Sequence, residues 1–405
     1  MPKKIEYQNK TKKKSSQSII ILCIFVMIIA NSLAYIYFPI TNRGYPLLSF
    51  MTTKGRFDDF YNSIYTNFGN LINSTGNLTL HPLSVLIGNI FSITPKDVSA
   101  VMFFVVFSGL LFYSLGKLSN SILIPIMVFV SYPYQFTIAR GNNEIILVAV
   151  AALMYSLIIQ KNYKKGFQRF IILNLVEPYP LYLFQFIAFK NQIKNQIKTY
   201  MAFAFLLIVS ALLSGTGRAY LTGLISEGRG NVNVMSPGTT LHSSSIGGAL
   251  EFLWAIMSDT SIFESNYINT SLLFIEIAGF FLLFFFFFRN KGNVDLVTSS
   301  ILIICFWTLL NNPSFDYRLL HFFIPLSIMF KQAIGTRDLP ILILMILLFL
   351  PKPFLFFIYP ENQLGITLGS VVNPILLLIL IILTLVRFKK NFSKADLKNG
   401  TMNKN

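Results

Sequence analysis

The sequence predicts an all-α polytopic membrane protein with about ten transmembrane helices. Of its 405 residues, 54% are hydrophobic and only 12% are charged, whereas soluble domains carry roughly 25% charged residues. Apolar runs of about 17 to 22 residues recur along the chain, and this is the length that crosses a hydrocarbon core. The third observation is the placement of the basic residues, described below.

The first apolar run follows a basic segment but is long and has no small-residue cleavage site, so we interpret it as a retained helix. Residues 1–17 and 387–405 are then basic cytoplasmic tails that flank one transmembrane domain, 18–386. The predicted spans are 18–38, 98–116, 119–138, 142–160, 199–216, 268–288, 295–311, 318–330, 339–357 and 366–386.

Basic residues are distributed unevenly between the two sides of this topology. The net charge is +17, and only nine of the 33 Lys and Arg fall outside or near the outer surface, which leaves 24 on the cytoplasmic side. This asymmetry is the positive-inside rule. It predicts a bacterial-type cytoplasmic membrane protein with both termini in the cytoplasm, and the basic excess needs no nucleic-acid partner to explain it. The nine outer residues are Arg43, Lys54, Arg56, Lys96, Arg140, Arg218, Arg229, Arg318 and Lys352.

Cysteine and histidine give no pattern of a metal or disulfide site. Cys23 and Cys305 both lie within predicted spans, where cysteine acts as a small apolar residue. The three histidines are far apart in sequence. We therefore predict no metal and no cofactor.

One segment, 170–189, interrupts the alternation of spans because basic clusters flank it on both sides. Its centre reads Glu177-Pro178-Tyr179-Pro180, and two prolines so close do not fit one straight helix. We predict a re-entrant hairpin of two short helices. A full span with a basic outer loop is the alternative.

Two outer segments, about 39–94 and 217–266, are long enough to hold structure. Within the first, Leu80–Ile93 is apolar but too short to cross, so it is predicted to lie at the interface. The second is rich in Gly, Ser and Asn and ends in a semi-apolar helix around Leu250–Met257. Such a segment suits a loop that orders over a ligand.

The first outer segment contains two adjacent carboxylates, Asp58 and Asp59, with Arg56 upstream. Transfer of a sugar to a hydroxyl needs a base to take the hydroxyl proton, and a carboxylate at the membrane surface is suited to that task. A solvated loop with a local ion pair is the alternative interpretation.

A second group, Arg140-Gly141-Asn142-Asn143-Glu144, lies at an outer junction between two spans. Glu144 begins an apolar helix, and ionisable groups at membrane depth usually line a cavity or have a partner. Arg140 is the expected partner for Glu144 or for a lipid phosphate, because guanidinium and phosphate pair in a bidentate way. The alternative is an interfacial Arg140 with Glu144 as a helix-start residue.

A third group runs from Ser314 to His321 at another outer helix mouth, where Asp316 and Arg318 either serve the site or neutralise each other. His81 and His321 fit a structural role better than a catalytic one. These three groups and His242 lie on one face of the predicted topology, whereas a transport pathway would place charges along the membrane depth. The pattern indicates an enzyme that acts on lipid-linked material.

The order of these motifs resembles the GT-C glycosyltransferases, in particular glycosyltransferase family 87, over most of the chain. Two motifs depart from the family pattern: Glu177 stands where relatives have a basic residue, and His81 where they have an aromatic one. The motifs that carry the resemblance are Asp59-Phe60-Tyr61, Leu80-His81-Pro82-Leu83, Tyr132-Pro133-Tyr134, Arg140-Gly141-Asn142, Glu177-Pro178-Tyr179-Pro180, His242-Ser243-Ser244 and Asp316-Tyr317-Arg318-Leu319.

The resemblance implies transfer of a sugar, mannose in the best-known members, from a polyprenyl-phosphate donor to a glycan or glycolipid acceptor on the outer face. It implies that Asp59 or Asp58 is the general base. The implied donor-binding residues are Arg140, Asn142, Glu144, Arg318, Tyr317, His242 and Arg218. Candidates for acceptor binding or a structural role are His81, Arg56 and Glu177.

Two other function classes remain open from the sequence. A polysaccharide polymerase or ligase of the outer face would share lipid-phosphate chemistry, but such proteins favour Arg and His in their large outer loops. A flippase or transporter for lipid-linked glycans would show inverted repeats or a charged central cavity, and the sequence has no convincing internal repeat.

Overall fold

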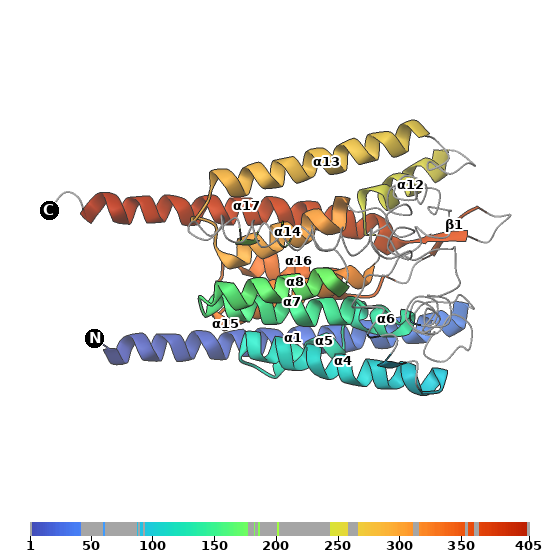
Figure 1. Cartoon of the computed structure of the whole chain (residues 1–405), viewed down its shortest axis with the longest axis horizontal. Helices are drawn as coiled ribbons and strands as arrows, with labels where there is room; N and C mark the ends of the chain where they lie inside the picture. Colours follow the sequence, from blue (N-terminus) through green and yellow to red (C-terminus); the bar gives the residue numbers. More distant parts are fainter. Residues whose placement is uncertain are drawn as a thin grey trace.

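The structure is a computed structural model of a long helical bundle (Figure 1). The residues that it describes are 2–41, 60, 87, 90–91, 94–176, 182, 185–186, 201, 244–257, 266–310, 316–352, 355–359 and 364–402.

Within these residues the chain is helical apart from one short β-hairpin. The α-helices are α1 Pro2–Thr41, α4 Lys96–Ser119, α5 Leu123–Phe129, α6 Tyr132–Arg140, α7 Glu144–Ile159, α8 Tyr163–Val176, α12 Ile246–Met257, α13 Asn266–Arg289, α14 Leu296–Leu310, α15 Phe323–Lys331, α16 Leu339–Phe349 and α17 Leu368–Met402. A 3₁₀ helix, η6, spans Asp316–Phe322, and the strands are β1 Leu355–Tyr359 and β2 Leu364–Thr367.

Three helices of the described chain are long and apolar enough to cross a membrane. Their spanning segments are Ser15–Ala34 in α1, Asp97–Ser119 in α4 and Leu368–Asn391 in α17. Helices α7, α14 and α16 are apolar but shorter. The predicted membrane class is therefore supported by helix length and composition.

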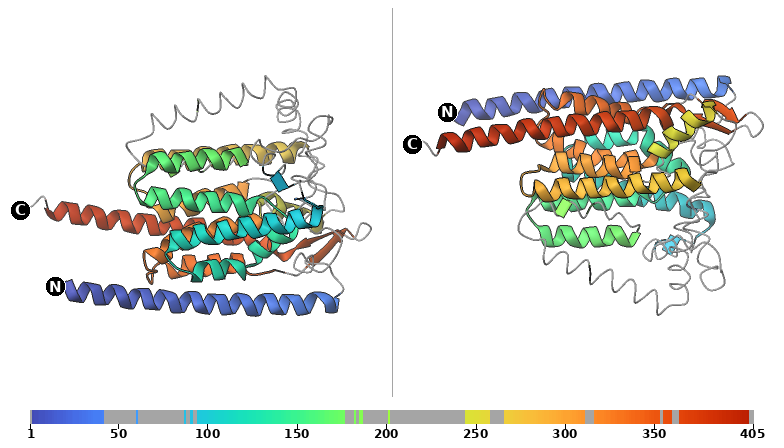
Figure 2. Two further views of the ribbon diagram at one scale, coloured as in Figure 1. Left: turned by 60° about the horizontal axis from the view of Figure 1, so that its bottom comes forward. Right: turned by 90° about the horizontal axis from the view of Figure 1, so that it is seen from above.

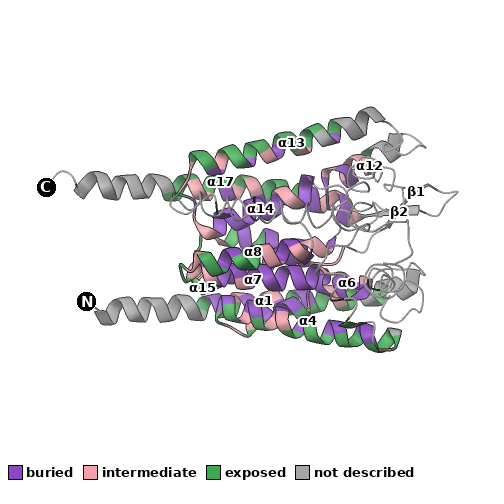
Figure 3. Cartoon of the chain, viewed as in Figure 1, coloured by how far each residue is buried: buried purple, intermediate pink, exposed green. Residues whose placement is uncertain are grey.

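Helix α7 forms the centre of the bundle. All but three of its sixteen residues are buried, and it packs against α4, α8, α15 and η6. A helix that is apolar on every side needs such complete burial. Helix α13, in contrast, lies at the edge of the bundle and exposes much of its surface (Figure 3). Exposed side chains of α13 include Phe274, Phe281, Phe285 and Phe288, an arrangement that suits a lipid environment.

The two termini lie at the same end of the bundle in all views, where α1 and α17 extend beyond the other helices (Figures 1 and 2). The β-hairpin, α6 and α12 lie at the opposite end. We call these the terminal end and the hairpin end.

The range 119–138, predicted as one span, does not form one continuous helix, because two short helices occupy it. Helix α5 ends at Phe129 and α6 begins at Tyr132, with Ser131 extended between them at ψ 144°. Pro133 has no N–H to donate to the carbonyl of Phe129 four residues earlier. A proline is tolerated in a first turn, which is where α6 places it.

The span predicted over 339–357 also needs correction, because α16 ends at Phe349 and β1 follows. Leu350 is extended, with φ −76° and ψ 144°, as expected for a residue that precedes a proline. Strand β1 pairs with β2 in an antiparallel hairpin. The all-α prediction therefore holds for the described chain apart from this hairpin.

The predicted span 318–330 is divided between η6 and α15. In a 3₁₀ helix with three residues per turn, side chains at i and i+3 lie one above the other. Arg318 and His321 therefore share one face of η6, and Asp316 lies about 120° away around its axis. The site depends on this arrangement.

The hairpin predicted over 170–189 remains a prediction, because Glu177–Pro180 lie outside the described residues. Helix α8 starts at Tyr163, inside the first of the two basic clusters that flank this segment, and ends at Val176. Beyond it, the buried side chain of Gln185 accepts hydrogen bonds from the hydroxyls of Tyr155 (2.9 Å) and Ser299 (2.8 Å). This part of the segment is thus tied to α7 and α14.

Other predictions have mixed outcomes. The helix predicted near 250–257 is present as α12, and the two cysteines lie in α1 and α14 as predicted. The span 199–216 lies outside the described residues except for Met201, and most of Leu80–Ile93 does too.

Candidate functional site

Helix η6 carries two buried polar centres near the hairpin end of the bundle, one around Asp316 and one around His321. Each joins segments that are distant in sequence. In the second centre, Glu144 of one predicted group contacts His321 of another.

The first centre is the carboxylate of Asp316, which is 2% exposed. Its Oδ1 accepts hydrogen bonds from Ser244 Oγ (2.6 Å) and Asn373 Nδ2 (3.0 Å), and its Oδ2 accepts one from the Tyr132 hydroxyl (3.3 Å). Asn373 Nδ2 also lies 3.0 Å from Ser244 Oγ. This centre therefore connects η6 with α6, α17 and the residues that precede α12.

Burial raises the pKa of Asp316 above its ordinary value, although the hydrogen bond from Ser244 and the positive charge of Lys352 act in the opposite direction. Lys352 also donates from Nζ to the carbonyl oxygens of Leu350 (3.1 Å) and Leu348 (3.5 Å) at the end of α16, where a cation is favoured by the helix dipole. Burial lowers the pKa of Lys352 to about 8, against the attraction of Asp316.

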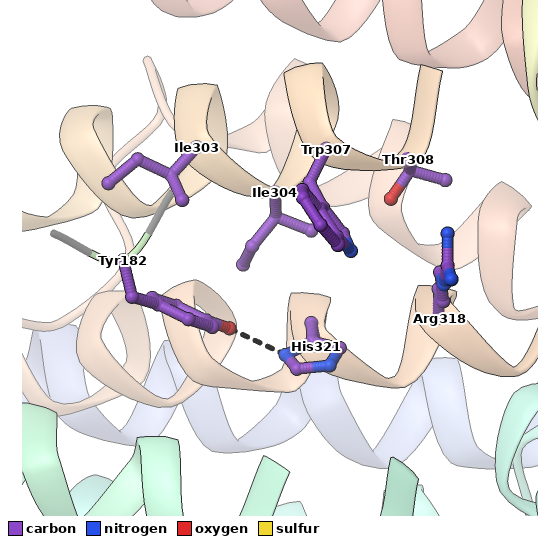
Figure 4. A pocket seen from close by; sticks show the side chains of 7 residues that line it. All are labelled: Tyr182, Ile303, Ile304, Trp307, Thr308, Arg318 and His321. Atoms are coloured by element: carbon purple, nitrogen blue, oxygen red, sulfur yellow. Dashed lines mark hydrogen bonds between the residues drawn. The ribbon is translucent and has the colours of Figure 1, made fainter. Parts of the chain in front are cut away.

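The second centre is the imidazole of His321, which is also 2% exposed. Its Nε2 lies 2.7 Å from Oε1 of Glu144, and its Nδ1 lies 2.5 Å from the Tyr182 hydroxyl (Figure 4). An ionised carboxylate can only accept, so an ionised Glu144 would accept from Nε2–H and would leave Nδ1 of a neutral imidazole to accept from Tyr182. The resulting order is hydroxyl, imidazole and carboxylate.

The start of α7 explains the Arg140-Gly141-Asn142 motif in physical terms. Helix α6 ends at Arg140, and Gly141 adopts the left-handed conformation with φ 77°, which costs glycine little. Asn142 Oδ1 then accepts from the backbone N–H of Glu144 at 2.9 Å. Arg140 and Glu144 are thus placed on either side of a tight turn, and Glu144 is the first residue of α7 as the helix-start interpretation proposed.

Arg318 lies on the His321 face of η6 and is half-buried. Its guanidinium lies 5.6 Å from the centre of the Trp307 ring, which is within cation–π range, and it interacts electrostatically with Glu276 of α13. Tyr317 points to another side, where its ring stacks on Phe136 with centroids 6.0 Å apart.

The remaining predicted site residues lie outside the described residues, so their predicted roles stay predictions. They are Asp58, Asp59, Arg56, His81, Glu177, Arg218 and His242. Their described neighbour Phe60 is buried against Phe103 and Phe104 of α4.

Sequence reasoning missed several members of these two centres. Arg140 was the expected partner of Glu144 or of a lipid phosphate, and the structure adds His321 as a partner of Glu144 that the sequence did not indicate. Tyr182 and Asn373 gave no signal, because single neutral polar residues are common in membrane helices and loops, and Ser244 stood in the His242-Ser243-Ser244 motif without an assigned role. The described residues contain no group of three His, Cys, Asp or Glu that could hold a metal.

No protein-family model matches the chain, and neither a curated protein nor a solved structure is significantly similar to it.

Proposed function

We propose that this chain is a membrane glycosyltransferase that moves a sugar from a polyprenyl-phosphate donor to a glycan or glycolipid acceptor. The observation that supports it best is the gathering of Glu144, Asp316, Arg318 and His321 on and around η6, near one end of an apolar bundle. Buried ionisable groups in a membrane protein are costly and mark function more often than not. Their one-sided location favours chemistry at the membrane surface over transport.

The proposed topology follows the charge distribution. Both termini lie in the cytoplasm of a bacterial cell, the domain has about ten spans in a GT-C-like arrangement, and the hairpin end faces outward. The terminal end carries basic residues such as Arg289, Lys331, Arg387 and Lys389, which is the composition of a cytoplasmic face. On this topology the η6 centres lie on the outer side.

The proposed reaction is an inverting displacement. Asp59 or Asp58 takes the proton of the acceptor hydroxyl, whose oxygen attacks the anomeric carbon from the face opposite the phosphate. The bond from that carbon to the phosphate oxygen breaks, and its electron pair leaves with the polyprenyl phosphate. Arg140, Arg318 and Arg218 hold the phosphate and stabilise the charge that develops on it.

The test is a radiolabelled transfer assay on the purified protein in lipid, with a panel of polyprenyl-phosphate sugars and wild-type protein beside Asp58→Asn and Asp59→Asn. Transfer by wild type that one variant loses by roughly 100-fold or more, while it still folds and binds donor, would identify the base. Full activity in both variants would retain the reaction and reject these two bases. If the wild type neither binds nor turns over any donor, a flippase or transporter becomes the better explanation.

A further inference from the structure

Basic side chains surround the terminal end of the bundle. Four turns between described helices lie at this end, α4–α5, α7–α8, α13–α14 and α15–α16 (Figure 1). Each has exposed lysine or arginine within it or in the adjoining turn of helix, and α17 adds two exposed lysines where it leaves the bundle. We call these residues the basic ring: Lys117, Lys161, Lys164, Lys165, Arg289, Lys331, Arg337, Lys389 and Lys390.

The carboxylates at the terminal end do not offset this charge. Among the acidic side chains that the structure describes, Asp295 and Asp338 lie there, and Arg387 binds both of them. The side chain of Arg387 is only 14% exposed. The two carboxylates are therefore neutralised by a cation that lies inside the ring, and the exposed charge of the ring stays positive.

The basic ring lies where the exposed apolar surface of the helices ends. On α13, Arg289 directly follows Phe288, which is 59% exposed. On α4, the ammonium of Lys117 lies 5.8 Å from the ring centre of Tyr113, whose side chain is also exposed. Lysine and arginine stems that leave an apolar surface hold their charge at the level of lipid headgroups, and tyrosine is typical of the same level. The charges of the ring are thus placed at the depth of headgroup phosphates.

The spread of the ring indicates which kind of anion it fits. Helices α13 and α4, which carry Arg289 and Lys117, lie at opposite edges of the bundle (Figure 1). A compact acidic protein on the end face would have to fit around α1 and α17, which extend beyond the other helices there (Figures 1 and 2). The lipids of a leaflet, in contrast, adjoin every edge of the bundle. An anionic leaflet therefore matches both the charge and the shape of the ring.

We propose that the terminal end binds anionic phospholipids through the basic ring, and that this binding stabilises the folded chain. Lysine and arginine of the ring contact the headgroup phosphates of the surrounding leaflet. Each basic residue near an anionic membrane surface increases the affinity roughly fivefold. The inference does not depend on sugar transfer, because the candidate site lies near the opposite end of the bundle.

Thermal unfolding of the full-length protein in a nonionic detergent tests the proposal. The protein is titrated with dioctanoyl phosphatidylglycerol and, in parallel, with dioctanoyl phosphatidylcholine, which has the same acyl chains and no net charge. We expect the anionic lipid to raise the melting temperature more than the neutral one does. This difference between the lipids should be large at about 50 mM salt and small at about 500 mM, because salt screens exposed charges.

Substitutions of single lysines separate the ring from other charges. Lys164→Gln, near the start of α8, should reduce the difference between the two lipids, and the triple variant Lys161→Gln/Lys164→Gln/Lys165→Gln should reduce it further. Lys96→Gln is the matched control, because Lys96 begins α4 at the hairpin end beside the exposed Asp97. It should leave the difference unchanged. Since each variant is compared in the two lipids, a general loss of stability does not affect the result.

Equal responses of the wild type to the two lipids would overturn the proposal, as would a preference for the anionic lipid that persists unchanged in high salt or in the triple variant. Equal losses of preference in Lys96→Gln and Lys164→Gln would mean that net charge alone is responsible, and would also reject the ring. If the triple variant loses the whole preference and Arg289→Gln keeps all of it, one local binding site replaces the ring.

Discussion

His321 Nε2 lies 2.7 Å from Oε1 of Glu144, and this contact joins two helices whose residues are 177 positions apart. Both side chains are almost completely buried. Because a buried imidazole needs partners for both nitrogens, Glu144 and Tyr182 together fix the rotation of His321. The same contacts hold in place the face of η6 that His321 shares with Arg318.

Replacement of Glu144 tests this dependence. Glu144→Ala should lower the free energy of unfolding by about 1–3 kcal/mol, because it leaves Nε2–H buried without an acceptor. Glu144→Gln keeps an acceptor oxygen and should cost less. Thermal unfolding of both variants in detergent provides the measurement, and an equal loss in the two proteins would contradict the hydrogen-bond explanation.

Asp316 should be even less tolerant of substitution, because three donors converge on its carboxylate. Asp316→Asn places an amide N–H₂ where a donor already points, so we expect a loss of about 2–4 kcal/mol of stability. Asn373→Asp is the matched control, since it replaces one of these donors with a second carboxylate. If the double variant with both changes recovered stability relative to either single variant, the pairing would be established by a mutant cycle.

The pKa of Lys352 predicts a specific pH dependence of stability. Its folded-state pKa of about 8 lies below the ordinary value of 10.5. Between these values the unfolded chain binds more protons than the folded one, so the stability of the wild type rises with pH across this window. Lys352→Met should lack this contribution. The difference in melting temperature between the two proteins should shift in favour of the wild type from pH 7.5 to 9.5, and a constant difference would reject the lowered pKa.

Arg140 is expected to affect the proposed reaction differently from Asp59. Arg140→Gln removes a charge partner of the donor phosphate and should weaken donor binding as well as turnover, by roughly tenfold or more in affinity. Asp59→Asn should lower turnover and leave binding unchanged. Separate measurement of donor affinity and transfer rate distinguishes the two. Unchanged affinity in Arg140→Gln would assign this arginine to the turn between α6 and α7.

The parts of this architecture that depend on local sequence were predictable, and the parts that depend on contacts between distant segments were not. The membrane class and most helix positions follow from apolar runs, and Glu144 was correctly placed at a helix start. The predicted span boundaries were incorrect near Pro133 and Pro351. The sequence stays apolar across both prolines, but each proline interrupts the helix. The proline signal was available in the sequence at both places.

The site was less predictable, because its contacts are non-local. Asp316 and Arg318 were recognised as candidates, but their different directions follow from the 3₁₀ form of η6, for which the sequence gives no clear signal. The sequence suggested only the nearby Arg140 as a partner of Glu144, and the structure shows a further partner, His321, from a distant segment. A single sequence contains no signal that would predict a contact between two positions so far apart.

Arg387 lies at the terminal end of the bundle, so its substitution tests stability separately from the candidate site. Its Nε donates to Asp338 Oδ1 at 2.9 Å, and its Nη1 lies 3.0 Å from both carboxylate oxygens of Asp295. Asp295 also accepts from the backbone N–H groups at the start of α14, and Asp338 precedes α16. One guanidinium therefore holds the first turns of two helices against α17.

Arg387→Lys should cost about 1–2 kcal/mol of stability, because a single ammonium does not reproduce the fork that reaches both carboxylates. Arg387→Ala should cost about 2–4 kcal/mol, since two partly buried carboxylates then lack their cation. Lys389→Ala, an exposed lysine on the same helix, should change stability by less than about 0.5 kcal/mol. Thermal unfolding in detergent gives the ranking. A loss of stability in Arg387→Lys no larger than the loss in Lys389→Ala would contradict this role of the guanidinium.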